Sequence, residues 1–266
     1  MMRRKIVARA LPAALAVCCI ASIAFAQKKQ IRIAAASNLQ TVMPEIARAF
    51  EVHSGTHVDV VYGSSGNFYA QIQNGAPFDV FFSADTMYPQ KLEESGYADP
   101  HSSVIYGLGK IVLWMRTNGP CDPEREGWKC LLNQKVKKIA IANPDHAPYG
   151  RAAVAALQRA GIYDEVKAKL VFGENISQAA QFVESGNAQA GILAYSLVVS
   201  PALRSGSKWE IPTDLYQPIE QSVVVLKSAQ DKPTAEAFVK FVTDGAGRDL
   251  LEKFGFQPPD RNQGTR

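Results

Sequence analysis

Apolar runs that suit β-strands alternate along this chain with segments of helical spacing. In the first half, the runs rich in β-branched and aromatic residues are 31–35, 58–62 and 78–82. Each is followed by a segment with the apolar spacing of a helix, at 39–50, 67–73 and 86–94. Such a strand–helix–strand order predicts a mainly parallel sheet with helices on its faces.

The same alternation returns after an interruption near Gly119 and Pro120. One strand-like run, 110–115, precedes the interruption. Beyond it, strand-like runs at 136–142, 168–172 and 191–195 alternate with helical segments at 150–159 and 177–184. A late strand at 222–226 and a helical region at 234–254 end the pattern. The sequence therefore predicts an α/β protein of two blocks, and periodicity leaves open whether the last segments return to the first block.

The first 26 residues have the pattern of a secretory signal peptide. Basic residues precede an apolar run from Leu11 to Phe25, which ends in a small–x–small pattern. We expect cleavage after Ala26 and a periplasmic location. Lipidation is the alternative, but it requires a small residue before the cysteine, and Val17 precedes Cys18. The run is also short for a membrane span.

Removal of this leader abolishes the net charge. The full chain carries 29 Lys and Arg against 25 Asp and Glu, a net charge of +4. The leader holds four of the basic residues and no acidic residue, so the remaining 240 residues (266 − 26) carry 25 (29 − 4) of each sign. A chain of this size suits one large domain or two lobes with separate cores. Its charge predicts no nucleic-acid partner and no anionic membrane partner.

Two cysteines remain after the leader, Cys121 and Cys130. In an oxidising compartment, an even pair so close in sequence predicts a disulfide. The chain-entropy model gives such a short loop a stabilisation of roughly 2–3 kcal/mol. A metal site is the alternative, but neither cysteine has a histidine or a further cysteine within ligand spacing.

Polar turns stand between strand and helix at four places. The turns are Ala36-Ser37-Asn38, Gly63-Ser64-Ser65-Gly66, Pro148-Tyr149-Gly150 and Glu174-Asn175-Ile176-Ser177. In a parallel sheet such turns meet at the carboxyl ends of the strands, where ligands bind. Helix starts offer free backbone N–H groups and about half a positive charge, so several that face one point form an anion site without Arg or Lys. Ser and Asn are also ordinary helix N-caps, and a single turn does not distinguish the two interpretations.

These turns lie in segments that resemble the periplasmic molybdate-binding proteins. The similar segments are Ala34–Leu39, Tyr62–Gly66, Ala70–Ile72, Asn74–Asp85, Ala142–Gly150 and Gly173–Ile176. The resemblance runs from about Ile31 to Phe256. It implies the two-lobed type II periplasmic binding-protein fold, in which each lobe is a mainly parallel sheet flanked by helices and the ligand lies in the cleft between the lobes. The implied organisation is a signal peptide at 1–26, a first lobe at 27–109 and 222–266, and a second lobe at 110–221.

The resemblance also implies which residues hold the oxyanion. By position, Ser37 and Ser65 supply hydroxyl and amide donors from the first lobe. Tyr149 and Ile176 supply backbone N–H groups from the second lobe. These contacts bind the oxygen atoms, so no direct metal ligand is expected.

This chain departs from the family in one strand. Many members carry a tyrosine where this sequence has Ala194, and Tyr195 comes one step later. Because neighbouring strand residues point to opposite faces, the contribution of Tyr195 is in doubt. The side-chain amide of Asn38, or the hydroxyl of Tyr149, is expected to compensate.

The expected function is therefore binding without catalysis. The protein would capture molybdate or tungstate and deliver it to the membrane permease of an ABC transporter, as a monomer and without a cofactor. Both ligands are fully ionised dianions at neutral pH, so a site of hydrogen-bond donors alone suits them. Phosphate keeps a proton and would want an acceptor, for which Asp85 and Glu174 are candidates, because a buried acceptor without a proton to take costs free energy.

Two alternatives stay open. The same fold could bind sulfate, another oxyanion or an organic acid, and the sequence does not separate sulfate from molybdate. A different class is an exported hydrolase with Ser64 or Ser65 as nucleophile. That reaction requires a base within hydrogen-bond reach, and the sequence identifies none. His146 lies in the second-lobe turn, and we expect it not to contact the ligand.

Overall fold

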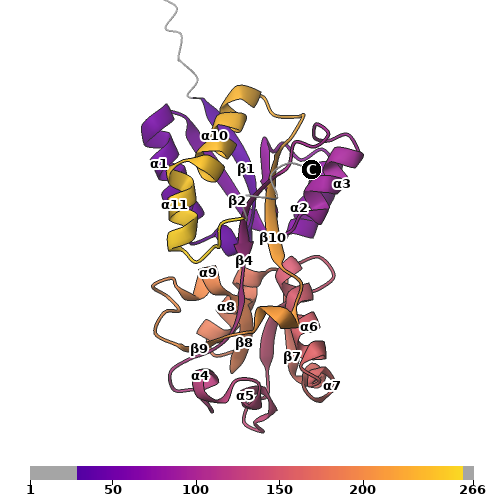
Figure 1. Ribbon diagram of the computed structural model, residues 1–266, viewed down its shortest axis with the longest axis vertical. Coiled ribbons are helices and arrows are strands. Elements are labelled where there is room, and N and C mark those ends of the chain that lie inside the picture. The colour runs from indigo at the N-terminus through magenta and orange to yellow at the C-terminus, as the bar shows by residue number, and fades with distance from the viewer. Residues whose placement is uncertain (1–28, 260–266) are drawn as a thin grey trace, which may run out of the picture.

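The computed structural model describes residues 29–259 and shows two lobes, each built on a five-stranded sheet (Figure 1). The predicted signal peptide at 1–26 lies outside the described residues. The strand order is β2-β1-β3-β10-β4 in the first sheet and β7-β6-β8-β5-β9 in the second. No helix in the described part of the chain is long and apolar enough to cross a membrane.

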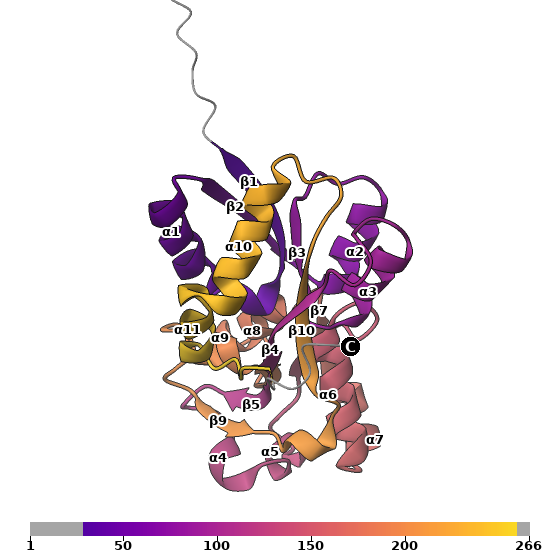
Figure 2. The same ribbon diagram turned by 45° about the horizontal axis from the view of Figure 1, so that its top comes forward.

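The first lobe contains both ends of the described chain. Its strands are β1 (Gln30–Ala36), β2 (His57–Gly63), β3 (Val80–Phe82), β4 (Val104–Gly109) and β10 (Ile219–Val225). Its helices are the 3-10 turn η1 (Ser37–Leu39), α1 (Met43–Ser54), α2 (Ser65–Gln73), α3 (Met87–Glu94), α10 (Lys232–Asp244) and α11 (Ala246–Lys253). Figure 2 shows α1, α10 and α11 on one side of this sheet and α2 and α3 on the other.

The second lobe repeats the arrangement with shorter elements. Its strands are β5 (Ile111–Met115), β6 (Ile139–Ala142), β7 (Leu170–Gly173), β8 (Ala190–Ala194) and β9 (Ser207–Glu210). Its helices are α4 (Pro123–Glu126), α5 (Lys129–Leu132), α6 (Pro148–Arg159), α7 (Tyr163–Val166), α8 (Ile176–Glu184) and α9 (Tyr195–Val198), with 3-10 turns η2 (Lys167–Lys169) and η3 (Thr213–Leu215).

Both sheets are mixed in the same way. In each, four strands share one direction, and the fourth strand in the order, β10 or β5, is antiparallel to both of its neighbours. The predicted α/β class with mainly parallel strands is therefore confirmed, with one reversed strand per sheet. Those reversed strands are the first strands that the chain enters after it crosses between the lobes.

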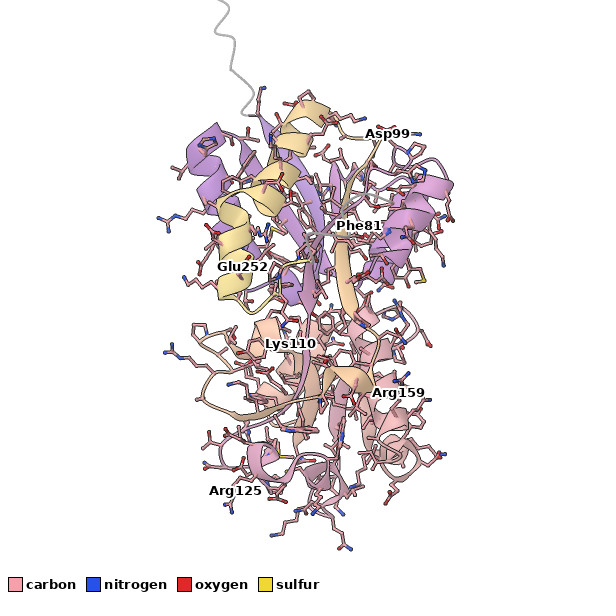
Figure 3. All side chains as sticks on the ribbon, in the orientation of Figure 1. Phe81, Asp99, Lys110, Arg125, Arg159 and Glu252 are labelled. Atoms are coloured by element: carbon pink, nitrogen blue, oxygen red, sulfur yellow. A yellow bond between two sulfur atoms is a disulfide. The ribbon has the colours of Figure 1, made fainter. Side chains whose placement is uncertain are left out.

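The chain crosses between the lobes at two places. Lys110 alone separates β4 from β5, and it lies at the waist of the molecule (Figure 3). The return runs between β9 and β10, and β10 begins at Ile219, three residues before the start expected from the sequence. Strand β4 was not predicted, because Gly107 and Gly109 weaken the strand pattern of its sequence.

Strands β1 and β3 of the first sheet bury side chains on both faces, as a central strand between two helix layers must. Ile33 and Ala35 belong to the core on the side of α1 and α10, and Ala34 belongs to the core on the side of α2 and α3. Phe82 and Phe81 divide in the same way. This alternation fixes the register of β1 and β3 and thereby the positions of the turns that follow them.

The helix expected from Leu39 begins later than its apolar spacing suggests. Residues 37–39 form η1, and α1 starts at Met43 with Pro44 in its first turn. Proline fits the first turn of a helix because its missing N–H group needs no acceptor there. The separate 3-10 turn places Ser37 and Asn38 at the end of β1, where both are buried.

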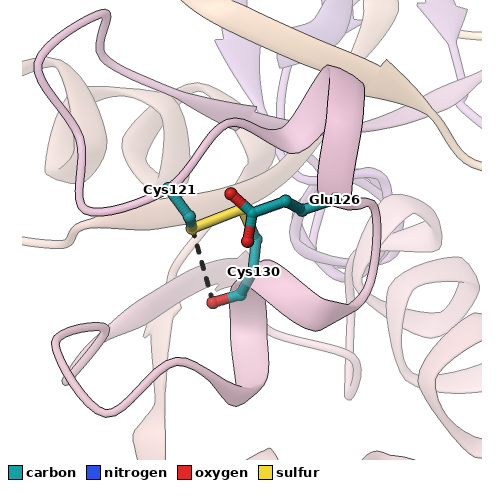
Figure 4. A group of neighbouring side chains, drawn as sticks. All are labelled: Cys121, Glu126 and Cys130. Atoms are coloured by element: carbon teal, nitrogen blue, oxygen red, sulfur yellow. Dashed lines mark hydrogen bonds between the residues drawn. A yellow bond between two sulfur atoms is a disulfide. The ribbon is translucent and has the colours of Figure 1, made fainter.

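Cys121 and Cys130 are joined by a disulfide, with Cα atoms 5.6 Å apart (Figure 4). Glu126 lies beside the bridge, and the three side chains are close enough to resemble a metal site. Metal binding uses thiolates, and both sulfurs are already bonded to each other. This group lies in the second lobe, outside the cavity described below.

Candidate functional site

One cavity lies where the carboxyl ends of strands from the two lobes meet. The empty space there, with the adjoining open solvent included, is about 190 Å³. The lining residues are Ala36, Ser37, Asn38, Gly63, Ser64, Ser65, Ala84, Ala147, Pro148, Tyr149 and Ile176. This set includes all five ligand-binding residues predicted from the sequence: Ser37, Asn38, Ser65, Tyr149 and Ile176. None of the lining residues has a charged side chain, so any anion here is held by neutral donors.

The hydroxyl oxygens of the two first-lobe serines each accept a hydrogen bond from the backbone. Ser65 Oγ accepts a hydrogen bond from the backbone N–H of Ala84 at 2.9 Å, and Ser37 Oγ accepts one from the N–H of Ser177 at 3.4 Å. A hydroxyl that accepts in this way keeps its own hydrogen for another partner. Neither serine caps a helix: Ser37 lies within η1, and Ser65 is the first residue of α2. The N-cap interpretation therefore does not account for them.

The second lobe offers backbone groups instead. Tyr149 and Ile176 lie in the first turns of α6 and α8, where helix geometry provides no intrahelical acceptor for their N–H groups. Asn175 is an ordinary N-cap, since its side chain accepts from the N–H of Gln178 at 3.0 Å. At this turn the side chain of Asn175 stabilises the helix start, and the next residue, Ile176, lines the cavity.

Asn38 belongs to a buried hydrogen-bond network behind the cavity. Its Nδ2 atom lies 2.8 Å from Oε1 of Gln221, whose Nε2 atom lies 3.0 Å from the hydroxyl of Tyr149. Asn38 and Gln221 are both fully buried. Burial raises the pKa of the Tyr149 hydroxyl well above its usual range, so this hydroxyl stays protonated. Gln221 was missed in the sequence, because a lone glutamine in a late strand carries no motif.

Tyr195 does not reach the cavity. It begins α9 instead of ending β8, and its ring lies against Gly255 near the end of the described chain. A methyl group on Gly255 would come within 2.3 Å of that ring. Ala194, the preceding residue, is buried but is also not a lining residue of the cavity.

Hydrogen bonds close the two lobes around the cavity. The N–H of Gly66 donates to the carbonyl of His146 at 2.9 Å, and His146 Nδ1 lies 2.9 Å from Ser64 Oγ. On the same side, Asn67 Nδ2 donates to Glu174 Oε1 at 3.0 Å. These contacts join α2 of the first lobe to the turns before α6 and α8 of the second. The structure is therefore a closed form.

An ion pair adds to this closure. Arg151 of α6 lies 2.5 Å from Asp85, in the turn after β3. Burial raises the pKa of Asp85, although the N–H of Tyr88, the Ser83 hydroxyl and Arg151 each favour the charged form. Asp85 and Glu174, the two candidate acceptors for a protonated anion, are thus engaged elsewhere, and neither lines the cavity.

The contact between Ser64 and His146 bears on the hydrolase alternative. The sequence identifies no base for a serine nucleophile, whereas the structure places an imidazole within hydrogen-bond reach of Ser64. A triad also needs a third group that orients the base. Within residues 29–259, no hydrogen bond to the other ring nitrogen of His146 is found. The pair is an interlobe contact that lacks the third member of a triad.

The comparisons with known proteins agree on one family. The profile of the bacterial extracellular solute-binding protein family matches residues 31–257. The molybdate-binding protein ModA of Azotobacter vinelandii is 40% identical over 232 residues, which cover 87% of this chain and 91% of that protein. The solved Azotobacter vinelandii periplasmic molybdate-binding protein superimposes with a TM-score of 0.81 at 34% identity, over 86% of this chain and all of that one.

A sulfate-binding protein has the same fold at a greater distance. SubI from Mycobacterium tuberculosis superimposes with a TM-score of 0.71 at 17% identity, over 88% of each chain. At that identity the likeness concerns the fold alone.

Proposed function

The chain belongs to the bacterial extracellular solute-binding proteins, and we propose that it captures molybdate or tungstate and delivers the anion to the permease of an ABC transporter. The relatives at 34–40% identity are molybdate-binding proteins, which supports this ligand over sulfate. The expected event is lobe closure around a desolvated oxyanion, with no chemical step.

The observation that carries the proposal is the convergence of donors from both lobes on one uncharged cavity. We assign the hydroxyls of Ser37 and Ser65, and the side chain of Asn38, to the first-lobe half of the site. The N–H groups of Tyr149 and Ile176 form the other half. A fully ionised tetrahedral dianion accepts hydrogen bonds at every oxygen and donates none. A donor-only cavity therefore suits it, and it penalises an anion whose proton would meet no acceptor.

The remaining parts of the proposal concern location and partners. We propose export to the periplasm, with a signal peptide cleaved after Ala26, and action as a monomer. We propose lobes of 27–109 with 222–266, and of 110–221; the start of β10 at Ile219 supports moving the return boundary from 222 to 219. The closed form would dock on the permease, which then receives the anion as the lobes open.

Calorimetric titration of the mature protein tests the ligand. Molybdate, tungstate and sulfate are titrated separately in a phosphate-free buffer. We expect tight one-to-one binding of molybdate and tungstate and far weaker binding of sulfate. Tight binding of sulfate with weak binding of molybdate would identify sulfate as the ligand of the same fold. No binding of any of the three anions would contradict the oxyanion site.

The Ser64–His146 contact makes hydrolysis the second candidate function. One assay distinguishes hydrolysis from binding without catalysis. Under the binding proposal the wild-type protein does not turn over a chromogenic ester. Turnover that disappears in Ser64→Ala and in His146→Ala would support the hydrolase instead.

A further inference from the structure

A buried network of four side chains connects the cavity to the place where the chain crosses between the lobes. Gln221 stands at its centre, close to Asn38, Tyr106 and Tyr149. The pairing of β4 with β10 shifts its register between Gln221 and Ser222, so Tyr106 is passed over as in a β-bulge. Gly109 leaves room for this network, because a methyl group there would lie 2.2 Å from the Tyr149 hydroxyl and 2.4 Å from Gln221 Nε2.

One orientation of the two amides leaves this network short of partners. With Asn38 Nδ2 donating to Gln221 Oε1, the Asn38 Oδ1 atom is buried and has no hydrogen-bond partner among the described residues. The single hydrogen of the Tyr106 hydroxyl then faces two acceptors, Gln221 Oε1 at 2.8 Å and the carbonyl of Ser83 at 3.0 Å. An unpaired buried acceptor is costly, so this arrangement is not the most stable one available.

A half-turn of both amides satisfies every member. The oxygen and nitrogen of an amide exchange places in such a turn, and the partners decide between the two orientations. Gln221 Nε2 then donates to Asn38 Oδ1 and to the Tyr106 hydroxyl, which donates in turn to Ser83. The Tyr149 hydroxyl contacts both amides, and it then donates its hydrogen to one of their two oxygens. The Asn38 Nδ2 group takes the place of the unpaired oxygen.

The lining of the cavity indicates on which side that place lies. Asn38 lines the cavity and Gln221 does not, so the amide atom of Asn38 turned away from Gln221 is the one on the ligand side. An oxygen there would repel a dianion, whereas it could accept a hydrogen bond from a protonated anion. A nitrogen there completes a cavity lined only by donors.

We propose that Gln221 is a positioning residue that holds the Asn38 amide with its N–H groups toward the ligand and so selects fully deprotonated oxyanions over protonated ones. The inference rests on the proposed function and deepens it. It also assigns the one hydrogen of Tyr149 to the amide oxygens of Gln221 and Asn38, which leaves Tyr149 only its backbone N–H for the anion. Of the two side chains expected to compensate for the missing tyrosine, Asn38 does so and the Tyr149 hydroxyl does not.

The test is a double-mutant cycle on molybdate affinity. A glutamate at position 221 accepts hydrogen bonds but offers no N–H, so Gln221→Glu holds Asn38 with its oxygen toward the cavity. We expect a loss of about ten- to hundredfold in affinity, and a larger loss for molybdate than for phosphate. In an Asn38→Ala background, Gln221→Glu can act only through its charge and packing, and we expect a loss of about threefold or less. An equal loss in both backgrounds would overturn the proposal.

Tyr149→Phe gives a second reading that does not depend on substituting Gln221. Because the Tyr149 hydroxyl donates its hydrogen within the buried network, its removal is expected to weaken molybdate binding less than Asn38→Ala does. A loss of tenfold or more in Tyr149→Phe, with little loss in Asn38→Ala, would show that the tyrosine hydroxyl is the donor, and would overturn the assignment.

Neutron diffraction on the ligand-free protein tests the orientation by itself. Deuterium on the Asn38 atom that faces away from Gln221 supports the proposal, and deuterium on the atom that faces Gln221 refutes it. This result stands even if the wild-type protein fails to bind molybdate. Failure of the proposed function is thus distinguished from failure of the positioning role.

Discussion

The two halves of the cavity present the same kind of donor by different chemistry. In the proposed site, the first lobe contributes side-chain donors of Ser37, Asn38 and Ser65 in addition to backbone N–H groups, whereas the second contributes only the backbone of Tyr149 and Ile176. A side-chain donor depends on residue identity, and a backbone donor depends on where a helix begins. The side chains of the first lobe therefore determine the selectivity of the proposed site. The second lobe needs only correctly placed helix starts.

One glycine in each lobe lies where another part of the backbone or another side chain comes too close for a Cβ atom. In the second lobe, a Cβ at Gly150 would come within 2.2 Å of the carbonyl of Ala142, so glycine lets α6 start directly above β6. In the first lobe, a Cβ at Gly66 would lie 2.6 Å from the hydroxyl of Tyr88 in the same lobe, and 2.8 Å from both the Cβ and the carbonyl oxygen of His146 in the opposite lobe. One glycine thus places a helix start, and the other permits the lobes to close.

The largest effect is expected for Gly66→Ala, which obstructs closure without touching any of the five proposed ligand residues. If the methyl group reduces the closed form to about 1% of the population, the apparent dissociation constant for molybdate rises about a hundredfold. Gly107→Ala is the matched control, because its nearest contacts would be 3.4 Å, an ordinary distance. Titration calorimetry of both variants measures the difference. Equal affinity of Gly66→Ala and wild type would mean that the interlobe contact at His146 is not needed for binding.

The second prediction removes a backbone donor from the second lobe. Ile176 is the first residue of α8, where proline fits a helix, and Asn175 before it is extended, as a residue before proline prefers to be. Ile176→Pro therefore deletes the N–H group while α8 is kept. A hydrogen bond to a charged group contributes about 1.5–3 kcal/mol, so we expect a ten- to hundredfold loss of molybdate affinity.

Ile176→Ala is the control for this substitution, because it shortens the side chain and keeps the N–H group. It is expected to lower the melting temperature while molybdate affinity changes little. Circular dichroism on both variants verifies that α8 is retained. If Ile176→Ala weakens binding as much as Ile176→Pro does, the second lobe acts through its side chain, and the contrast between the lobes fails.

The third prediction removes a side-chain donor from the first lobe. Ser65→Ala deletes the hydroxyl proposed to bind the anion, and it also leaves the buried N–H of Ala84 without its acceptor. We expect about a tenfold loss of molybdate affinity and a loss of about 1–3 kcal/mol in the free energy of unfolding. Ser95→Ala, on the exposed end of α3, is the control. Unchanged molybdate affinity in Ser65→Ala would remove this residue from the proposed site.

The sequence predicts the turns that form both halves of the cavity better than it predicts the contacts between side chains that complete them. The turns that contain Ser37, Ser65, Tyr149 and Ile176 follow from the strand–helix alternation, because the carboxyl ends of parallel strands meet at one edge of a sheet. Pro44 could also have located the start of α1, since proline marks a first helical turn.

Gln221 and His146 could not be found in this way. Gln221 faces Asn38 only because of the irregular register between β4 and β10, which depends on which side chains pack across the strands. His146 contacts Ser64 across the two lobes, so the contact forms only when the lobes close. Closure depends on how two surfaces fit together, which the sequence of one segment does not show. Local patterns predict elements and their ends, whereas partners that are distant in sequence depend on the assembled fold.

The smallest effect is expected from pH, and it tests whether both halves share one property. Hydroxyl, amide and backbone donors do not change charge near neutrality. Burial raises the pKa of Tyr149, so its neutral form persists at high pH and is lost only as the pH rises through that raised value. We therefore expect molybdate affinity to vary by less than about twofold between about pH 6 and about pH 9, because no donor of the site titrates in that range. A steep change measured by calorimetry would mean that a charged side chain contacts the ligand, and His146 of the second lobe is the candidate by position. The second lobe would then bind the anion through the charge of His146 as well as through backbone N–H groups. The contrast between a side-chain half and a backbone half of the site would no longer hold.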